Sequence, residues 1–357
     1  MSATPVTLAP LDERLFAASV GALELFGVYL GDRLGLYGPL QRAGGLTVDE
    51  LSHACGIHPR YAREWLEQQA VAGVLVVDDA SKDAEERRYA LPAANAAVVA
   101  NATSPSYLAP LARMMVGIGG VIEKVVAAYK TGACVPYSCY GPDFRHGQGG
   151  INRPAFESAL VESWLPAMSI GATKLANGGR IADLGCGQGW AAMSVARAFP
   201  KAEVWGIDAD PSSVEDARGF AAEAGVRVRF ECADAAALSD HGPFDVVMLL
   251  EVLHDLARPA EALRGARRAL AKDGAVLVAD EAVEPKFTAP GSDMERMMYG
   301  WSITHCLPTQ MVEQPSAAIG TVIRESLVRD LAAEAGFLRV DVLAADGGFF
   351  RLYELRA

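Results

Sequence analysis

The sequence has few cysteines and fewer basic than acidic residues. The six cysteines, at positions 55, 134, 139, 186, 232 and 306, form no C-x-x-C pair. Zinc sites and disulfide frameworks use clustered cysteines, so we expect reduced thiols and no metal site. The chain has 32 Lys and Arg against 44 Asp and Glu, a formal net charge of −12, which argues against a protein that coats nucleic acid.

The N-terminus lacks the signals of export and membrane insertion. Residues 1–10 contain no basic residue and no long apolar run, both of which a signal peptide needs. The apolar segment 15–40 is interrupted by Glu24, Asp32 and Arg33, which argues against a membrane span. We therefore expect a soluble cytoplasmic protein. Because 51% of its 357 residues are hydrophobic, the chain can bury a large core, and its length favours two domains.

Residues 1–110 are predicted to form a winged-helix and dimerisation domain. Segment 11–42 is apolar on nearly all sides at helical spacing, which is typical of helices buried in a core or against a partner subunit. We interpret it as a pair of helices that makes a homodimer. Thr47 and Glu50 form a capping box before a short helix, and a second helix follows at 58–73. Three side chains of that second helix are expected to point inward: Tyr61, Trp65 and Leu66.

Two strand-like runs at 74–77 and 87–91 complete the pattern of a winged helix. Such a domain could bind DNA or serve in packing and dimerisation, and its charge distinguishes these two roles. A DNA-binding winged helix needs a basic surface. Residues 1–88 instead hold thirteen acids and eight bases, a net charge of −5, and the second helix carries Glu64 and Glu67. We therefore favour a packing role and expect no nucleic-acid partner.

Residues 111–175 are predicted to form a helical connector and lid. An amphipathic helix at 111–130 precedes a loop at 133–150 that is rich in glycine, proline and aromatic residues, and a helix returns at 154–175. Loops of this length are often functional. Trp164, in the last of these helices, is a candidate for contact with a bound substrate.

Residues 176–357 are predicted to form an α/β domain. Strands and helices alternate there, which implies a mostly parallel sheet with helices on both faces. The predicted strands are 180–185, 203–208, 227–234, 244–250 and 275–283, followed by a hairpin of 337–345 and 349–356. A ligand of the nucleotide type would bind at the carboxyl ends of the parallel strands.

The turn after the first of these strands carries the strongest motif. Residues 183–189 read D-L-G-C-G-Q-G, and Gly185, Gly187 and Gly189 let a ligand approach the backbone closely. The Asp183 carboxylate would repel a pyrophosphate but suits a ligand with a cationic amino group. The motif resembles the first motif of class I S-adenosylmethionine-dependent methyltransferases.

The next strands also end in residues that such a cofactor needs. The Asp208 carboxylate can accept hydrogen bonds from both ribose hydroxyls. The Asp234 carboxylate can accept one from the adenine amino group, while the Ala235 amide donates to a ring nitrogen. Each acid alone could be a turn residue, but acids at three successive strand ends favour a nucleoside site. The backbone of Leu250 and Glu251 is placed to meet the methionine part. Two neighbours in these turns complete the cofactor candidates: Cys186 and Ala209.

Segments along most of the chain resemble one bacterial group, the methyltransferases with an N-terminal winged-helix domain. They are Y-S-C-Y-G-P-D-F-R (137–145), I-N-R-P (151–154), H-C-L-P (305–308) and E-A-G-F (334–337). The resemblance implies a Rossmann-like seven-stranded methyltransferase sheet, a homodimer and S-adenosylmethionine as cofactor. It also implies cofactor contacts from Tyr140 or Phe144, but it implies no particular substrate.

His254 is the candidate general base. His254 and Asp255 follow the fourth strand and resemble the His-Asp pair of small-molecule O-methyltransferases, in which the histidine deprotonates the acceptor hydroxyl. Methyl transfer from a sulfonium needs approach geometry, exclusion of water and, for a hydroxyl acceptor, a base. A histidine pKa near neutrality suits that role. Those enzymes usually have tryptophan after the aspartate, where this chain has Leu256, and a ligand-lining or capping role for His254 is an equal alternative.

Segment 294–308 is the candidate acceptor pocket, because methionine and aromatic side chains suit an apolar, adaptable ligand. Ordinary core packing is the alternative for most of them. The candidates are Met298, Tyr299, Trp301 and His305. The sequence thus predicts a homodimeric S-adenosylmethionine-dependent methyltransferase of a small apolar or aromatic molecule, with oxygen preferred as acceptor atom. A transcriptional regulator that uses the cofactor as effector and an NAD-dependent oxidoreductase remain as alternatives.

Overall fold

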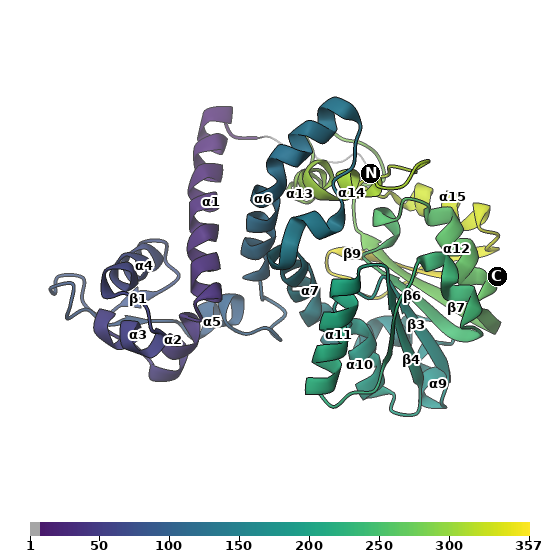
Figure 1. Cartoon of the computed structure of the whole chain (residues 1–357), viewed down its shortest axis with the longest axis horizontal. Helices are drawn as coiled ribbons and strands as arrows, with labels where there is room; N and C mark the ends of the chain where they lie inside the picture. The colour runs from purple at the N-terminus through teal and green to yellow at the C-terminus, as the bar shows by residue number, and fades with distance from the viewer. Residues whose placement is uncertain (1–7) are drawn as a thin grey trace. The chain divides into compact units, whose positions relative to one another are not determined.

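The chain divides into two compact units (Figure 1). The computed structural model describes residues 8–357, apart from the side chains of residues 236 and 237. The winged-helix unit comprises residues 8–117 and 142–154, and the sheet unit comprises residues 118–141 and 155–357. The stretch 111–175, predicted as a separate connector, is therefore shared between the units, and its role as a lid stays a prediction.

The winged-helix unit has the predicted order of helices and a short wing. Thr47 and Glu50 form the capping box that the sequence predicts. Trp65 and Leu66 lie in the core, but the inward orientation predicted for Tyr61 is wrong, since this side chain is 77% exposed. Tyr61 follows the helix start directly and falls on the solvent side of the apolar stripe. The elements are α1 (Leu11–Arg33), α2 (Tyr37–Ala43), α3 (Val48–Cys55), α4 (Pro59–Val71), β1 (Val76–Val77), β2 (Tyr89–Ala90) and α5 (Ala93–Val99).

Helix α1 exposes most of its apolar side chains. Within its unit, small residues of α1 lie close to the core: Trp65 Nε1 donates to the carbonyl of Gly27 at 2.9 Å, and a Cβ at Gly31 would collide with Tyr37 and Trp65. Val28 is partly buried against the same core. α1 is long and apolar enough to cross a membrane by length and composition alone, a test that core helices and signal sequences also pass. Seven of its large apolar side chains are at least 40% exposed: Leu11, Leu15, Phe16, Val20, Leu23, Phe26 and Leu30.

The loop predicted at 133–150 is wrong, because most of that stretch is helical. It contains η1 (Tyr137–Tyr140) and α7 (Gly141–Glu157), after α6 (Pro110–Thr131). The glycines that suggested a loop allow helices to approach each other instead. A Cβ at Gly147 would lie 2.7 Å from Met114 Cγ, and one at Gly117 would lie 2.6 Å from Phe144 Cβ. Close helix packing, rather than a flexible turn, accounts for this glycine content.

The sheet unit contains the predicted seven-stranded sheet, in the order β5-β4-β3-β6-β7-β9-β8 (Figure 1). The first five strands in this order are parallel, and β9 is antiparallel to both neighbours. The strands are β3 (Arg180–Leu184), β4 (Glu203–Asp208), β5 (Arg229–Cys232), β6 (Phe244–Leu250), β7 (Leu270–Glu281), β8 (Arg339–Val342) and β9 (Phe350–Arg356). This order confirms the methyltransferase sheet that the sequence predicted.

Alternating side chains of the strands pack into two separate cores, one on each face of the sheet. In β6, Val246 and Met248 join the core under α10, whereas Val247 and Leu249 join the core under α12 and α15. Successive side chains of a strand point to opposite faces, so a sheet covered on both sides has continuous apolar strands. The covering helices include α10 (Trp190–Ala198), α11 (Pro211–Glu223), α12 (Pro259–Arg268) and α15 (Glu325–Glu334).

Further short elements surround the carboxyl edge of the sheet or connect to it. They are η2 (Leu160–Trp164), α8 (Leu165–Ala167), α9 (Gly171–Ala176), η3 (Ala235–Asp240), η4 (Leu253–Asp255), α13 (Asp293–Trp301), η5 (Ser302–Cys306) and α14 (Leu307–Gln310). The helix predicted at 154–175 is therefore broken into several pieces. Pro154 lies inside α7 rather than at the start of a new helix.

Candidate functional site

The glycine turn after β3 has a backbone that only glycine adopts easily. Gly185, Gly187 and Gly189 have φ of 73°, 50° and 77°. Side chains at Gly185 and Gly189 would collide with Val252 and Phe230, whereas a Cβ at Gly187 would meet no atom within 4 Å. The outer two glycines therefore permit tight packing, and the middle one leaves open space above the backbone.

Asp183 and Asp208 lie at the ends of the paired strands β3 and β4. The Asp208 carboxylate accepts from the amides of Gly187 and Asp210, both at 2.8 Å, and so fixes the glycine turn. Asp183 is 2% exposed, and its Oδ2 accepts no hydrogen bond from any residue that the structure describes. Burial and the nearby Asp208 charge raise the pKa of Asp183 to about 7. This oxygen thus lacks a donor, and a cationic group would satisfy it.

Asp234 and Ala235 follow β5 at the same edge of the sheet. They line a surface pocket together with Leu256, Ala257 and Arg258. The pocket lies between the end of β5 and the segment that follows η4. The rest of its lining is Glu261, Ala262 and Glu313, so apolar side chains alternate with three carboxylates and one guanidinium.

The end of β6 adopts an unusual backbone. Glu251 has φ of 56°, a left-handed conformation that non-glycine residues rarely adopt, and its amide donates to the carbonyl of Ala279 at 2.7 Å. Such conformations occur preferentially at functional sites. The chain then enters η4, which carries His254.

His254 is held between two carboxylates. Its ring is 2% exposed, with Nδ1 2.6 Å from Asp280 Oδ1 and Nε2 3.3 Å from Asp255 Oδ1. The His254 amide also donates to Asp280 Oδ2 at 3.1 Å, and Gln310 donates to its carbonyl. Burial alone would lower the pKa of His254, but the charges of Asp280 and Asp255 outweigh it and raise the pKa well above its usual value.

Further acids surround this histidine. Glu281 is 4% exposed, and its Oε2 makes no hydrogen bond within the described part of the chain. Burial raises the pKa of Glu281 to about 8 and that of Glu251 well above its usual value. The charges of Asp280 and Asp255 add to both pKa shifts, the charge of Glu281 adds to that of Glu251, and His254 opposes both. The region therefore has more carboxyl groups than cationic partners among its described side chains.

The residues predicted to bind the acceptor differ in their surroundings. Met298 and His305 are buried, Trp301 is half-buried, and Tyr299 is 39% exposed. Trp164 is fully buried in the sheet core, where its ring contacts Phe156 and Phe350 and its Nε1 donates to the carbonyl of Asp346 at 3.0 Å. These are the contacts of a core residue, so we leave Trp164 out of the proposed acceptor pocket.

The two aromatic residues that the resemblance adds to the cofactor site lie in different units. Tyr140 belongs to the sheet unit, where its ring centroid is 4.6 Å from that of His305 and its hydroxyl donates to the carbonyl of Thr304 at 2.8 Å. Phe144 belongs to the winged-helix unit, buried beside Gly117. A cofactor contact from either residue stays a prediction.

Asp280 and Cys306 are partners in this site that the sequence motifs did not predict. Asp280 is in the strand predicted at 275–283, and Cys306 is the next residue after His305 in the chain. An acid near the carboxyl end of the strand beside β6 was a usable signal, because parallel neighbours end at the same edge. No pattern in the sequence brings Cys306 to His254.

Two family models match the chain. A methyltransferase domain matches residues 175–335, and an Rv2258c-like winged helix-turn-helix domain matches residues 21–101. Among solved structures, human N-acetylserotonin methyltransferase in complex with S-adenosylmethionine has the same fold, with a TM-score of 0.71, 17% identity and coverage of 99% of each chain.

Curated relatives match over shorter stretches. The chain is 37% identical over 103 residues to the ubiquinone biosynthesis O-methyltransferase of Caulobacter sp. (strain K31), which is 28% of this chain and 40% of that protein. It is 32% identical over 161 residues to the 27-O-demethylrifamycin SV methyltransferase of Amycolatopsis mediterranei (strain S699), which is 44% of this chain and 58% of the relative. The chain thus spans about half the length of these relatives. The family models thus place an Rv2258c-like winged helix-turn-helix domain before a methyltransferase domain in this chain, the combination that its motifs predicted.

Proposed function

We propose that this protein is an S-adenosylmethionine-dependent methyltransferase of a small apolar or aromatic molecule, with a hydroxyl oxygen as the preferred acceptor. The observation that carries the proposal is the pair of carboxylates at the ends of β3 and β4, beside a glycine turn whose middle residue faces open space. Solved methyltransferases of the same fold hold S-adenosylmethionine, as the human N-acetylserotonin enzyme does. When bound, this cofactor would supply the methyl group from its sulfonium.

The residues of the carboxyl edge fit the cofactor in an ordered way. Asp183, with its unsatisfied oxygen, suits the cationic amino group, and Asp208 suits the ribose hydroxyls while it holds the glycine turn. Asp234 and Ala235, in the surface pocket, suit the adenine. The backbone of residues 250–251 would meet the methionine part. The turn residues Cys186 and Ala209 complete the set.

His254 is the proposed general base. Asp280 accepts from Nδ1 and so fixes the ring, which leaves Nε2 to take the proton from the acceptor hydroxyl. Asp255 lies 3.3 Å from Nε2 and would stabilise the charged ring after proton transfer. Leu256, in place of the usual tryptophan, is half-buried and partly packed against the sheet core.

The acceptor pocket is proposed to lie along α13 and η5. Met298, Tyr299, Trp301 and His305 supply apolar and aromatic surface in the same unit as His254. Burial lowers the pKa of His305 to about 4, so its ring is neutral near pH 7 and adds no charge to the pocket. A neutral, aromatic lining favours an uncharged ring-containing acceptor.

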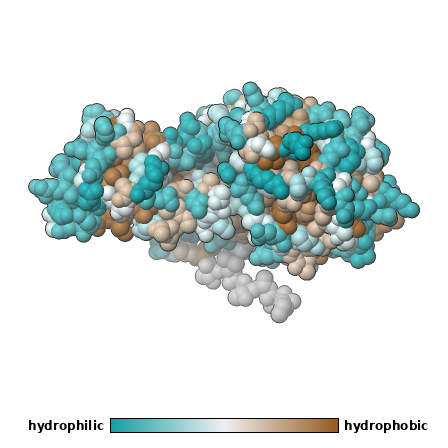
Figure 2. Space-filling model, turned by 90° about the horizontal axis from the view of Figure 1, so that it is seen from below, coloured by the Kyte–Doolittle hydropathy of each residue, from teal (hydrophilic) through white to brown (hydrophobic). Residues whose placement is uncertain are grey.

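We also propose a cytoplasmic homodimer formed through α1. A row of apolar side chains that is at least 40% exposed along one helix exceeds what a monomer usually leaves in water. On the face drawn in Figure 2, hydrophilic surface is interrupted by hydrophobic patches. A second copy of the chain would cover a self-complementary patch with closed symmetry.

The proposed activity is tested by calorimetry with S-adenosylhomocysteine and NADH in parallel. We expect binding of S-adenosylhomocysteine alone. Asp208→Ala should weaken this binding at least tenfold, because both the ribose contact and the support of the Gly187 amide are lost. Binding of NADH alone would reject the methyltransferase. A salt-sensitive, sequence-specific shift of the protein's own promoter DNA would favour a regulator instead.

A further inference from the structure

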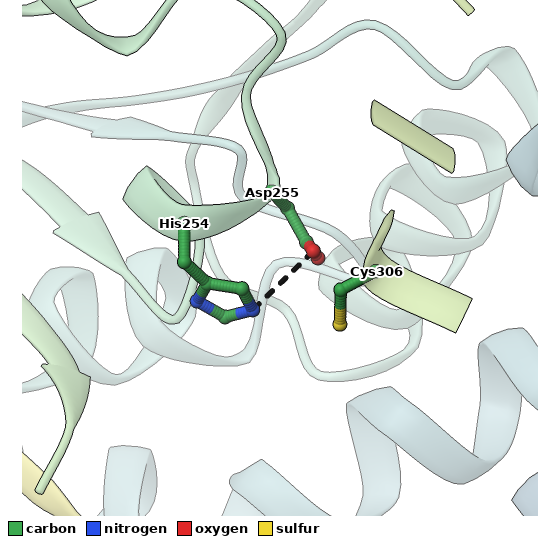
Figure 3. Close-up of side chains that lie close together, drawn as sticks. All are labelled: His254, Asp255 and Cys306. Atoms are coloured by element: carbon green, nitrogen blue, oxygen red, sulfur yellow. Dashed lines mark ion pairs between the residues drawn. The ribbon is translucent and has the colours of Figure 1, made fainter. Parts of the chain in front are cut away.

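Three side chains of metal-ligating type, one of them the proposed base, lie close together. His254 and Asp255 come from η4, and Cys306 comes from η5, 51 positions further along the chain (Figure 3). One nitrogen, one oxygen and the sulfur of this group all lie within 4.8 Å of one another. The sequence predicted no metal site because the cysteines do not cluster, but the fold gives this cysteine a histidine and an aspartate as neighbours.

The separation of His254 and Asp255 is close to that of two ligands of one metal ion. Their Nε2 and Oδ1 atoms form an ion pair at 3.3 Å, and the Asp255 carboxyl makes hydrogen bonds with both His254 and Cys306. In tetrahedral zinc sites the metal lies about 2.0–2.2 Å from nitrogen and oxygen ligands, which places these two ligands about 3.4 Å apart. The two atoms already have nearly this separation.

The orientation of the histidine is fixed by a second carboxylate. Asp280 Oδ1 lies 2.6 Å from Nδ1, so Nε2 is the nitrogen that faces Asp255. A metal-binding histidine nearly always donates its other ring nitrogen to a carboxylate or carbonyl in this way. Asp280 thus holds the His254 ring in the orientation that metal binding through Nε2 requires.

Burial and charge also favour a cation at this place. His254 and Cys306 are 2% and 5% exposed, and the carboxyls of Asp280 and Glu281 are buried close by. The Oε2 of Glu281 has no hydrogen-bond partner among the described residues. A thiol, an imidazole and a carboxylate together select borderline-soft ions such as Zn²⁺ over Mg²⁺ or Ca²⁺.

We propose that His254, Asp255 and Cys306 form a binding site for a divalent zinc ion. The ion takes Nε2, a carboxylate oxygen and the thiolate sulfur as ligands and leaves one position for water or another small ligand. On binding, Cys306 loses its S–H proton to solvent and forms a sulfur–zinc bond, with no change of oxidation state. His254 binds in its neutral form, so affinity increases with pH.

The consequence for catalysis rests on the proposed function. Nε2 cannot hold zinc and accept a proton from the acceptor at the same time. Bound zinc therefore inhibits methyl transfer, and a chelator restores it. The site is an inhibitory one in an enzyme whose proposed chemistry needs no metal.

Cobalt substitution tests the site directly in the full-length chain. Co²⁺ bound to a thiolate gives a near-ultraviolet charge-transfer band, and tetrahedral coordination gives intense visible bands. We expect one equivalent of Co²⁺ to produce both, and one equivalent of Zn²⁺ to abolish them. Cys306→Ser should lose the charge-transfer band, whereas Cys232→Ser, which changes an exposed cysteine, should keep it.

A second variant keeps the test decisive if Cys306→Ser does not fold. Asp280→Asn removes the carboxylate that orients the His254 ring through Nδ1 and should weaken Co²⁺ binding about 10–100-fold. Absence of the band in the wild-type chain, its persistence in Cys306→Ser or unchanged affinity in Asp280→Asn would each overturn the metal site. Because the spectrum is read without cofactor or acceptor, a failed metal site leaves the proposed methyltransferase standing. Conversely, a bound cobalt in a chain that binds no S-adenosylhomocysteine would reject only the function.

Discussion

His254 lies between carboxylates that hold a charge on its ring. Asp280 and Asp255 raise the pKa of the imidazole against the effect of burial. The charge of His254, in turn, holds the pKa of Asp255 at about 2, although burial alone would raise it. A base must be neutral before it accepts a proton, so the proposed reaction depends on pH in a direction that the structure fixes.

The first prediction concerns the pH profile of methyl transfer. In the wild-type enzyme kcat should increase as pH rises from about 6 to 9, because His254 loses its proton only above its usual pKa. In Asp280→Asn the charge that raises this pKa is gone, so the midpoint should move to lower pH while the maximal rate falls. Initial rates across this range, at saturating cofactor, measure both effects. A midpoint that does not move would remove Asp280 as the positioning residue for the base.

A second prediction concerns Asp183, whose pKa of about 7 lies above the value of about 4 expected in the unfolded chain. The folded state therefore holds this proton more tightly, and the associated stability is lost as pH rises from 4 to 7. Asp183→Asn cannot ionise, so its free energy of unfolding should exceed that of the wild type by on the order of 4 kcal/mol at pH 8, since each pKa unit corresponds to about 1.4 kcal/mol. The difference should be absent near pH 4.

Urea unfolding at the two pH values measures this difference without ligand. The same substitution should weaken binding of S-adenosylhomocysteine, because it removes the partner of the cationic amino group. Increased stability together with weaker binding would identify Asp183 as a binding residue maintained at a cost to stability. Equal stability at both pH values would contradict the raised pKa.

At the scale of elements, α6 and α7 pack closely because glycines at their contact have no side chains. A Cβ at Gly147 would lie 2.7 Å from Met114 Cγ and 2.9 Å from the carbonyl oxygen of Pro110. Gly147→Ala should therefore destabilise the chain by about 1–3 kcal/mol, as overpacking does. Gly119→Ala is the matched control, since its Cβ would meet nothing within 4 Å and alanine favours the helix by about 1 kcal/mol. Denaturant midpoints that move in opposite directions would confirm the contrast.

These same helices show where reading the sequence fails. The strands at 180–185 and 244–250 were predictable because their apolar runs are bounded by glycine or polar residues, and the sheet order followed from the family motifs. Gly147 led to the wrong prediction of a loop, because a glycine in a sequence can mark either a turn or a close contact between helices. That distinction depends on Met114, which is 33 positions away in the chain.

Some residues of the candidate site were likewise predictable from the sequence, and others were not. Local motifs identified Asp183, Asp208 and His254, since each follows its strand directly. The partners of His254 come from other elements: Asp280 through the parallel pairing of β6 with β7, and Cys306 through the packing of η5. Only the tertiary fold sets these distances, so no local pattern predicts them.

The whole molecule is predicted to form a dimer through α1. The double variant Phe16→Asp with Leu23→Asp places two charges in the exposed apolar row, where both wild-type side chains are more than 60% exposed. It should convert a dimer to a monomer without loss of fold, because neither residue is buried within its unit. Val71→Asp, at a position 91% exposed on α4, is the control and should stay dimeric. Sedimentation velocity distinguishes these states, and a monomeric wild-type chain would refute the interface.

Because the backbone passes more than once between the two units, neither unit can be isolated by a single truncation. The chain passes between them after Gly117, Gly141 and Pro154, and all three passages fall inside helices, the first in α6 and the other two in α7. Removal of everything before residue 118 would leave residues 142–154 without their partners. A fragment that starts at residue 155 would lack residues 118–141. Neither half is thus a contiguous piece of gene, so activity or DNA binding should be assigned by point substitution in the intact chain rather than by truncation.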